Sequence, residues 1–508
     1  EYGIANVKTS SADKDASSAF LKYADFSHYA DYFNGMEDEN IVQAIPNAKA
    51  SEWMEENIPL FECPQHNFEE MYYYRWWSLR KHIKETPVGY GMTEFLVQRS
   101  YSDKYNLIAC AIGHHIYESR WLRDPKYLDQ IIHTWYRGND GGPMKKMDKF
   151  SSWNADAVLA RYMVDGDKDY LLDMKKDLET EYQRWERTNR LKNGLYWQGD
   201  VQDGMEESIS GGRRKKYARP TINSYMYGNA KALSCIGILS GDEGMAMKYG
   251  MRADTLKNLV ENELWNTRHQ FFETMRTDSS ANVREAIGYI PWYFNLPDTT
   301  QKYEIAWKEI MDEKGFSAPY GLTTAERRHP EFRTRGVGKC EWDGAIWPFA
   351  SAQTLTAMAN FMNNYPQTVL SDSVYFRQME LYVESQYHRG RPYIGEYLDE
   401  VTGYWLKGDQ ERSRYYNHST FNDLIITGLI GLRPRLDNTI EVNPLIPADK
   451  WDWFCLDNVL YHGHNLTILW DKNGDRYHCG KGLRIFVDGK EVGQANTLTK
   501  IVCENALK

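Results

Sequence analysis

Hydrophobic and polar positions follow two different periods along this chain, a long stretch of helical spacing and a shorter stretch of β-type spacing. From about Phe68, bulky apolar residues recur three and four positions apart, which places them on one face of an α-helix. This spacing predicts twelve helical segments, at residues 68–85, 106–122, 127–138, 154–164, 169–189, 221–241, 242–265, 285–294, 302–313, 345–362, 373–387 and 419–431. The loops between them alternate long and short, and the long loops carry glycine, tryptophan and acidic residues.

Twelve helices joined by alternating loops fit six helical hairpins. We therefore predict a mainly α fold, an (α/α)6 toroid in which two rings of helices bury their apolar faces on each other. The long loops on one rim of such a ring are where function is expected to concentrate. The chain has no fixed-period sequence repeat, which weakens the alternative of an open solenoid.

Beyond Pro434 the hydrophobic period changes to two, which is typical of half-buried strands. The Asp488-Gly489 pair inside this region predicts a tight hairpin turn. Residues 1–64 show no strong period of either kind. These patterns predict an irregular N-terminal arm at 1–64, the helical toroid at 65–432 and a small antiparallel β-domain at 433–508.

Composition and charge narrow the classes of partner. There are 61 Lys and Arg against 71 Asp and Glu, so the formal net charge is −10 and nucleic acid, whose phosphates the chain would repel, is not an expected partner. No apolar run is long enough for a membrane span. Aromatic residues make up 14% of the chain. Most must fill the core, but carbohydrate-binding clefts also use exposed Trp and Tyr.

The cysteines, the histidines and the first residue bear on cofactors and location. The seven cysteines are odd in number and form no CxxC pair, so neither a zinc site nor a disulfide framework is predicted. The histidines do not cluster at ligand spacing, and no metal or other cofactor is expected. The chain begins at Glu1 without Met, which is the pattern of an exported protein, periplasmic or extracellular, trimmed of a leader; a cloning choice looks the same.

The acidic loop at residues 197–211 is the first stretch that indicates chemistry. It packs four carboxylates into eight positions, with glycines at 199, 204 and 211. Glycine lets backbone approach a ligand closely, and an aromatic face such as Trp197 stacks on sugar. General acid or base work on a neutral polar substrate is one interpretation, with Trp197 and Asp200 as substrate contacts. A calcium loop ranks lower because the alternating ligand pattern is missing. A solvated turn remains the simpler alternative until a partner carboxylate is found.

A second acidic stretch, residues 392–405, supplies that partner. Glu396 lies between Gly395 and Tyr397, in the long loop between the eleventh and twelfth helical segments. The first acidic loop lies between the fifth and sixth segments, so in a closed ring both loops share one rim. Two separated carboxylates that flank a substrate are what glycoside hydrolysis needs.

A third motif, residues 340–349, precedes the tenth helical segment. Trp342 and Asp343 have the side chains needed to stack on a sugar and bind its hydroxyl groups. Trp347 lies one turn into the helix, and its side chain is equally open to packing in the core or to contacting the sugar.

Three ordered signatures resemble the clan of inverting α-glycosidases that holds trehalases, the processing α-glucosidases of glycoside hydrolase family 63, and mannosylglycerate hydrolases. Gly204-Met205-Glu206 stands where that clan has Gly-(Trp/Leu/Met)-Asp, its general acid. Residues 342–347 are similar to its Trp-Arg-Gly-x-(Ile/Val)-Trp segment, and residues 395–403 resemble its Glu-x-Tyr-(Asn/Asp)-x-x-Thr-Gly segment, which holds the general base. The resemblance covers roughly residues 65–431 and implies a six-hairpin glycosidase that removes terminal α-linked sugars with inversion, without a metal.

By this resemblance Glu206 is the acid and Glu396 the base, with Tyr397 beside the base as a sugar contact. Trp121 and Asp124 correspond to an early Trp-Asp segment that contacts sugar in the clan. Two positions depart from the pattern. Glu206 replaces Asp, so Asp203 and Glu207 stay open as alternative acids, and Asp343 replaces Arg, so the sugar itself is open. α-Glucosides and α-mannosides are the expected class.

Two other functions remain open. A non-catalytic glycan-binding protein on a glycosidase scaffold would use the same aromatic residues, but it would not need paired carboxylates. A polysaccharide lyase or a hydrolase of uronates would need a basic cluster in the cleft, and residues 213–216, Arg-Arg-Lys-Lys, are the only such run.

Overall fold

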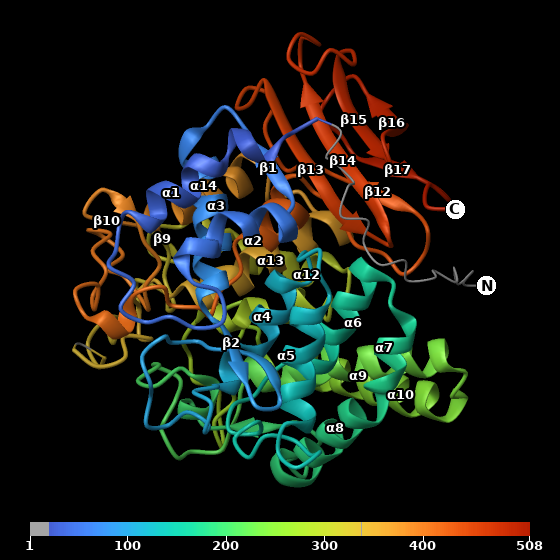
Figure 1. Cartoon of the computed structure of the whole chain (residues 1–508). Helices are drawn as coiled ribbons and strands as arrows, with labels where there is room; N and C mark the ends of the chain where they lie inside the picture. Colours follow the sequence, from blue (N-terminus) through green and yellow to red (C-terminus); the bar gives the residue numbers. More distant parts are fainter. Residues whose placement is uncertain (1–19, 337) are drawn as a thin grey trace.

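The computed structural model describes residues 20–336 and 338–508. It consists of a helix-rich body and a small antiparallel sheet formed mainly by the C-terminal residues, which packs against one side of the body (Figure 1). In the described part of the chain, no helix combines the length and the apolar character needed to cross a membrane.

The helices are α1 (Ser27–Asn34), α2 (Ala50–Asn57), α3 (His66–Lys81), α4 (Ile112–Ser119), α5 (Lys126–Arg137), α6 (Asn154–Asp165), α7 (Lys168–Asp173), α8 (Lys175–Asn189), α9 (Pro220–Ser240), α10 (Glu243–Leu259), α11 (Ile290–Tyr293), α12 (Gln301–Glu304), α13 (Pro348–Asn364), α14 (Asp372–Ser385) and α15 (Asn422–Leu424). The strands are β1 (Leu60–Glu62), β2 (Ile83–Thr86), β3 (Gly89–Met92), β4 (Trp197–Gln198), β5 (Tyr217–Ala218), β6 (Trp265–Asn266), β7 (Phe271–Phe272), β8 (Ser317–Ala318), β9 (Gly321–Leu322), β10 (Tyr387–His388), β11 (Arg391–Pro392), β12 (Ile440–Val442), β13 (Trp453–Tyr461), β14 (His464–Asp471), β15 (Gly482–Val487), β16 (Lys490–Ala495) and β17 (Ile501–Cys503).

The α9–α10 hairpin shows how local sequence sets the helix ends. Pro220 opens α9, where its fixed φ fits the first turn and its missing N–H is not needed. Gly241 ends the helix in the left-handed region at φ 73°, a conformation that costs glycine least. The side chain of Asp242 then caps α10 by accepting the backbone N–H of Met245 at 2.9 Å.

Three of the predicted helical segments are shorter and less regular than their periodicity indicates. Residues 286–289 form a 3-10 turn before α11, residues 305–310 form another after α12, and α15 runs into a π-helical turn at 425–429. A side chain on Gly428 would meet Tyr375, since a Cβ there would lie 1.9 Å from the tyrosine oxygen. Tyr375 of α14 therefore packs directly against this turn.

The C-terminal sheet confirms the predicted period-two strands. Its order is β1-β13-β14-β15-β16, and the pairings are antiparallel. Asp488 and Gly489, at φ 49° and 80°, form the predicted two-residue turn between β15 and β16. His462 and Gly463 have the same signs of φ between β13 and β14. Positive φ at both central residues gives the turn a twist that matches the strands.

The N-terminal region differs from the irregular arm that the sequence predicts. Residues 1–19 lie outside the described part, but 20–64 contain α1, α2 and β1. Each helix is only eight residues long and buries a few apolar side chains, such as Tyr29 and Phe33 in α1, so its periodic signal is short. Strand β1 pairs with β13, Leu60 opposite Asp457, and so ties this segment to the C-terminal sheet.

Candidate active site

Three loops meet through one tryptophan. Glu206 comes from the loop between α8 and α9, Trp342 from the loop before α13, and Glu396 from the loop after α14. The indole N–H of Trp342 donates to Glu206 Oε2 at 3.3 Å. The Trp342 ring also forms a T-shaped pair with Tyr397, the neighbour of Glu396, with ring centroids 5.0 Å apart. A backbone bridge between Ile346 and Leu398 joins the second and third loops.

A tight turn carries Glu206. Residues 201–203 form a 3-10 turn that Gly204 ends at φ 72°. A Cβ on Gly204 would lie 2.8 Å from the sulfur of Cys110, so the backbone there is pressed against the protein interior. Burial raises the pKa of the Glu206 carboxyl, and the negative charges of Asp200 and Glu396 raise it further, against lowering by its own backbone N–H and by Trp342.

Glu396 has the opposite electrostatic environment. Its Oε2 faces two cations, Arg412 Nη2 at 3.4 Å and Lys407 Nζ at 3.5 Å. The residue is only 7% exposed, so these charges act with little screening by water. Opposite charges at this distance attract each other. Lys407 also lies over the ring of Tyr397, 5.0 Å from its centroid.

An aromatic wall of stacked rings begins at Trp342, which contacts Glu206. The ring of Trp342 stacks on Trp347 with centroids 4.4 Å apart, and Trp347 stacks on Phe349 at 4.5 Å. The Trp347 N–H lies 2.9 Å from His418 Nε2. Indole nitrogen only donates, so this histidine nitrogen accepts and the proton of the neutral ring is on Nδ1. Burial holds the pKa of His418 well below its ordinary value.

Asp203 and Glu207, the alternative acids, are held by other partners. Asp203 Oδ2 accepts from Arg219 Nε at 2.6 Å and from the Thr221 hydroxyl at 2.5 Å, while Ser151 donates to Oδ1. Both side chains of the Asp203–Arg219 pair are fully buried. Glu207 forms an ion pair with Arg213 at 2.6 Å, on the more exposed edge of the loop.

The predicted substrate contacts in these loops have varied surroundings. Trp197 is half-buried in β4, and Lys216 Nζ lies 4.5 Å from its ring centroid. Asp200 is buried and accepts the backbone N–H of Val201 at 2.8 Å. Asp343 is fully buried, and its Oδ2 accepts the backbone N–H groups of Arg335 and Gly336 at 2.7 and 3.0 Å. In this structure Asp343 therefore fixes the loop that carries Trp342.

Trp121 and Asp124 lie apart from this cluster. Trp121 is buried and donates its N–H to Asp423 Oδ1 at 2.8 Å. Asp124 is partly exposed beside Lys126, just before α5. Between them in the chain, Arg123 contacts the backbone of Asn458 in the C-terminal sheet. The structure does not bring these two residues together with Glu206, Trp342 and Glu396.

Several residues near the carboxylates carry no motif that the sequence reveals. Lys149 lies near enough for the charge of Glu206 to raise its pKa, although burial lowers that pKa more. The ring of Tyr101, 5.5 Å from Lys149 Nζ, is 36% exposed. Glu94, Lys407 and Arg412 complete this set. Their neighbours in sequence are ordinary loop residues, and only the folded structure brings them to the site.

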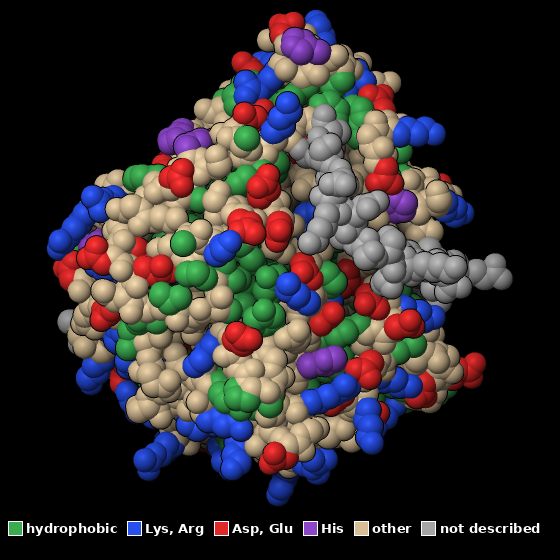
Figure 2. All heavy atoms as spheres, viewed as in Figure 1, with side chains coloured by type: hydrophobic (Ala, Val, Ile, Leu, Met, Phe, Trp, Pro, Cys, Tyr) green, Lys and Arg blue, Asp and Glu red, His purple; other side chains and the backbone are tan. Residues whose placement is uncertain are grey.

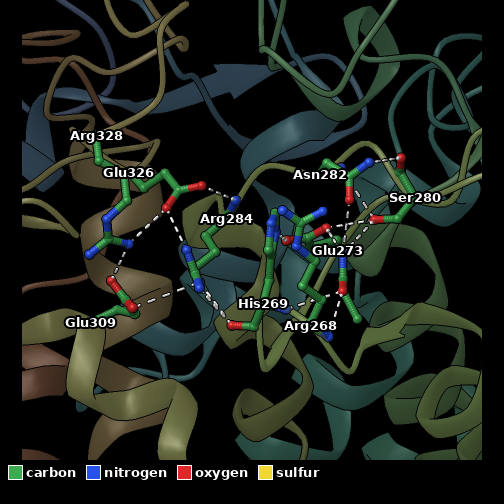
Figure 3. Close-up of polar contacts among 10 residues, drawn as sticks. Arg268, His269, Glu273, Ser280, Asn282, Arg284, Glu309, Glu326 and Arg328 are labelled. Atoms are coloured by element: carbon green, nitrogen blue, oxygen red, sulfur yellow. Dashed lines mark hydrogen bonds and ion pairs between the residues drawn. The ribbon is translucent and has the colours of Figure 1, made fainter.

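A polar network joins Arg284, Glu326 and Arg328 (Figure 3). Arg284 and Arg328 share Glu326 at 2.8 Å each, and Arg284 also donates to the backbone oxygen of His269. Arg276, which lies between Glu273 and Ser280 in the chain, donates from its guanidinium to the backbone oxygen of Ile209 at 3.0 Å. This contact links the segment to the first acidic loop. Among the residues that the structure describes, no three His, Cys, Asp or Glu side chains are grouped as a metal site would need.

The folded chain carries a glycoside hydrolase domain. The chain belongs to the mannosylglycerate hydrolase MGH1-like glycoside hydrolase family, whose domain matches residues 104–419. Residues 432–493 match the C-terminal domain of glycosyl hydrolase family 65. The predicted resemblance to the clan of mannosylglycerate hydrolases is thereby confirmed. Glu206, Trp342 and Glu396 all lie within the matched residues.

Three solved structures illustrate the range of similarity. One named "Sialidase" is 95% identical, with a TM-score of 0.97, over 99% of this chain and 46% of that chain. This chain therefore spans less than half the length of that protein. The family 63 mannosylglycerate hydrolase from Thermus thermophilus in complex with Tris is 12% identical, with a TM-score of 0.52, over 70% of this chain and 98% of its own. A family 78 rhamnosidase of Bacillus sp. GL1 is 11% identical, with a TM-score of 0.57, over 84% of this chain and 41% of its own. The last two share the fold.

Proposed function

We propose that this chain is an inverting glycoside hydrolase that removes a terminal α-linked sugar, with Glu206 as general acid and Glu396 as general base. The observation that carries the proposal is the contrast between the two carboxyls beside Trp342. Burial and neighbouring negative charge raise the pKa of Glu206, whereas the Glu396 carboxylate lies within 3.5 Å of two cations, Arg412 and Lys407. An acid and a base at one site need this difference.

In the proposed reaction, Glu206 gives its proton to the glycosidic oxygen as the bond to the anomeric carbon breaks. Glu396 takes a proton from a water molecule, whose oxygen attacks the anomeric carbon from the opposite face. The product sugar has the inverted configuration, and the two carboxyls end with exchanged protonation states. This geometry requires room for the water, a separation of about 6.5–9.5 Å between the carboxyls.

The contacts of Glu206 fit the role of general acid better than the contacts of Asp203 or Glu207 do. Asp203 already accepts from Arg219, Thr221 and Ser151, so a proton on it would displace a buried ion pair. Glu207 forms an ion pair with Arg213.

The body of the molecule fits a ring of six helical hairpins, the (α/α)6 toroid, and the shared fold of the family 63 structure supports this arrangement. The roles of Trp342, Trp347, Tyr397, Trp197 and Asp200 as sugar contacts are part of the same proposal.

A second candidate is hydrolysis of an acidic glycoside. The 95% identical structure is named a sialidase, although this chain spans less than half of it. Arg213, Arg214, Lys215 and Lys216 are exposed at the end of the first acidic loop, with Arg213 bound to Glu207. Figure 2 shows Lys and Arg side chains gathered along the lower edge of the viewed face. Such cations would attract an anionic substrate.

The test is a panel of aryl α-glycosides of glucose, mannose, galactose and rhamnose, together with aryl sialosides and uronosides. Product configuration is followed by NMR. We expect release of a neutral sugar in the inverted configuration and loss of release in Glu206→Gln and Glu396→Gln. Retention of configuration would overturn the acid–base assignment. Release only from acidic glycosides, lost when the four cations are replaced, would establish the second candidate. Binding of sugar with no release from any member would establish a glycan-binding protein.

A further inference from the structure

A third carboxyl, that of Glu94, belongs to the same neighbourhood and has an unused oxygen. Glu94 follows β3 and is 4% exposed. Its Oε1 accepts the Tyr416 hydroxyl at 2.8 Å. Its Oε2 is enclosed and has no hydrogen-bond partner among the described residues. An unpaired buried polar atom costs roughly 1–3 kcal/mol, and at a functional site it points to a partner that arrives with a ligand.

Contacts place Glu94 beside the aromatic wall described above. His418 Nε2 lies 3.8 Å from Glu94 Oε1, and the rings of Tyr416 and His418 are 3.7 Å apart. His418 accepts the Trp347 N–H, and Trp347 stacks on Trp342, which donates to Glu206. Glu94 lies ten positions before the residues matched by the family, so nothing in that match assigns it a role.

The protonation of Glu94 follows from its surroundings. Burial raises its pKa, and the charges of Glu396 and Glu206 add to the rise, which the Tyr416 hydroxyl opposes; the resulting pKa is about 8. Near neutral pH the carboxyl is therefore mostly protonated. Because Oε1 accepts from Tyr416, the proton is on Oε2, where it is a hydrogen-bond donor without an acceptor.

Glu118 shows what a purely structural buried glutamate looks like in this protein. It is 2% exposed. Its two oxygens accept three backbone N–H groups, those of Phe421, Asn422 and Asp423, at 2.8, 3.1 and 2.6 Å. Glu94 is buried to a similar degree but leaves one oxygen unpaired. Burial alone therefore does not account for the difference.

We propose that Glu94 is a substrate-contacting residue of this site, and that its Oε2–H donates a hydrogen bond to a hydroxyl group of the sugar held between Glu206 and Glu396. This inference rests on the proposed function. The last side-chain torsion of glutamate is soft, which would let Oε2–H turn toward the bound sugar. A donor directed at one hydroxyl group distinguishes sugars that differ in the orientation of that group.

The test compares Glu94→Ala, Glu94→Gln and the control Glu118→Gln, on the aryl glycoside that the wild-type protein hydrolyses best. We expect Glu94→Ala to lower kcat/KM by roughly 10-fold to 100-fold, mainly through KM, because a substrate hydroxyl loses its partner. Glu94→Gln keeps an N–H donor, so its loss is several times smaller. Glu118→Gln keeps the wild-type KM at each pH.

The pH profile separates a substrate contact from a structural role. Wild-type KM should rise as pH passes about 8, because ionisation of Glu94 removes the donor and adds a negative charge to the site. Glutamine does not ionise, so the KM of Glu94→Gln should not show this rise. Infrared difference spectra between pH 7 and pH 9 should show loss of a protonated carboxyl band in wild type and not in Glu94→Gln, a result independent of activity.

The outcomes are distinguishable. An active wild type whose KM and pH profile are unchanged in folded Glu94→Ala and Glu94→Gln would overturn the role of Glu94 alone. If Glu94→Ala does not fold, the pH profile of Glu94→Gln decides. A wild type that hydrolyses no member of the panel would overturn the proposed function, and with it this inference.

Discussion

Replacing Asp203 by Asn separates a structural carboxylate from a catalytic one. Asp203 and Arg219 form a fully buried ion pair with an N–O distance of 2.6 Å. Asn keeps the shape and leaves the guanidinium charge without its partner. Breaking a buried pair in this way costs about 3–5 kcal/mol. Unfolding entropy is about 2.1 cal/mol/K per residue, so over 508 residues this loss lowers Tm by about 3–5 °C.

The assay pairs thermal unfolding with hydrolysis of two glycosides of the same sugar, one with an alkyl and one with a dinitrophenyl leaving group. Glu206→Gln should keep the wild-type Tm within about 1 °C, because Glu206 is half-buried and has no ion-pair partner among the described residues. Its kcat on the alkyl glycoside should fall by about 10²–10⁴, the usual contribution of a general acid. The dinitrophenyl group leaves without a proton, so there the loss should be small.

Asp203→Asn should show the reverse pattern. Below its Tm it should retain the wild-type ratio of rates on the two leaving groups, because the proton donor is intact. The reasoning is refuted if Asp203→Asn unfolds like wild type yet loses activity only on the alkyl glycoside. Asp203 would then be the acid and Glu206 a neighbour.

Two further changes test the geometry around Glu206. Trp342→Phe keeps the stacked ring but removes the N–H at 3.3 Å that lowers the pKa of Glu206. Glu206 then holds its proton to higher pH, so the alkaline limb of the kcat profile should move to higher pH. An unmoved limb in the pH–rate profile would contradict the contact. Gly204→Ala puts a Cβ 2.8 Å from the Cys110 sulfur, at a residue with φ 72°. This change should lower the free energy of unfolding by about 1–3 kcal/mol and should lower kcat. The control is Gly241→Ala, because Gly241 has φ 73° and a Cβ there would meet no atom within 4 Å. It should lower the free energy of unfolding by less and leave kcat unchanged in steady-state assays.

Local signals in the sequence predicted the elements that local physics determines. The α9–α10 hairpin follows from Pro220, Gly241 and Asp242, each at the helix end that suits it. The β15–β16 turn follows from Asp488-Gly489. The pairing of β1 with β13 brings together residues about 400 positions apart, Leu60 and Asp457, and no local period carries that information. The same limit applies to α1 and α2, whose eight residues give too short a pattern.

For the candidate site, sequence motifs identified the loops better than the roles of their residues. Glu206, Trp342 and Tyr397 were expected near one another, and the structure joins them by direct contacts. Asp343 was expected to bind sugar, and this stays a prediction; its Oδ2 holds the backbone of residues 335 and 336, while its Oδ1 has no hydrogen-bond partner among the described residues. A buried aspartate that folds a loop and one that binds a hydroxyl group have the same sequence. Only the partner distinguishes them, and the partner is set by tertiary structure.

The electrostatics of the site require all three carboxyls to be considered together. Burial raises the pKa values of Glu206 and Glu94, and the charge of Glu396 adds to both rises. Two cations, Arg412 and Lys407, face Glu396 Oε2. Under the proposed function Glu206 is the acid, Glu396 is the base and Glu94 is a hydrogen-bond donor. The proposed division of roles therefore rests on the positions of Arg412 and Lys407, which lie outside every acidic motif in the chain.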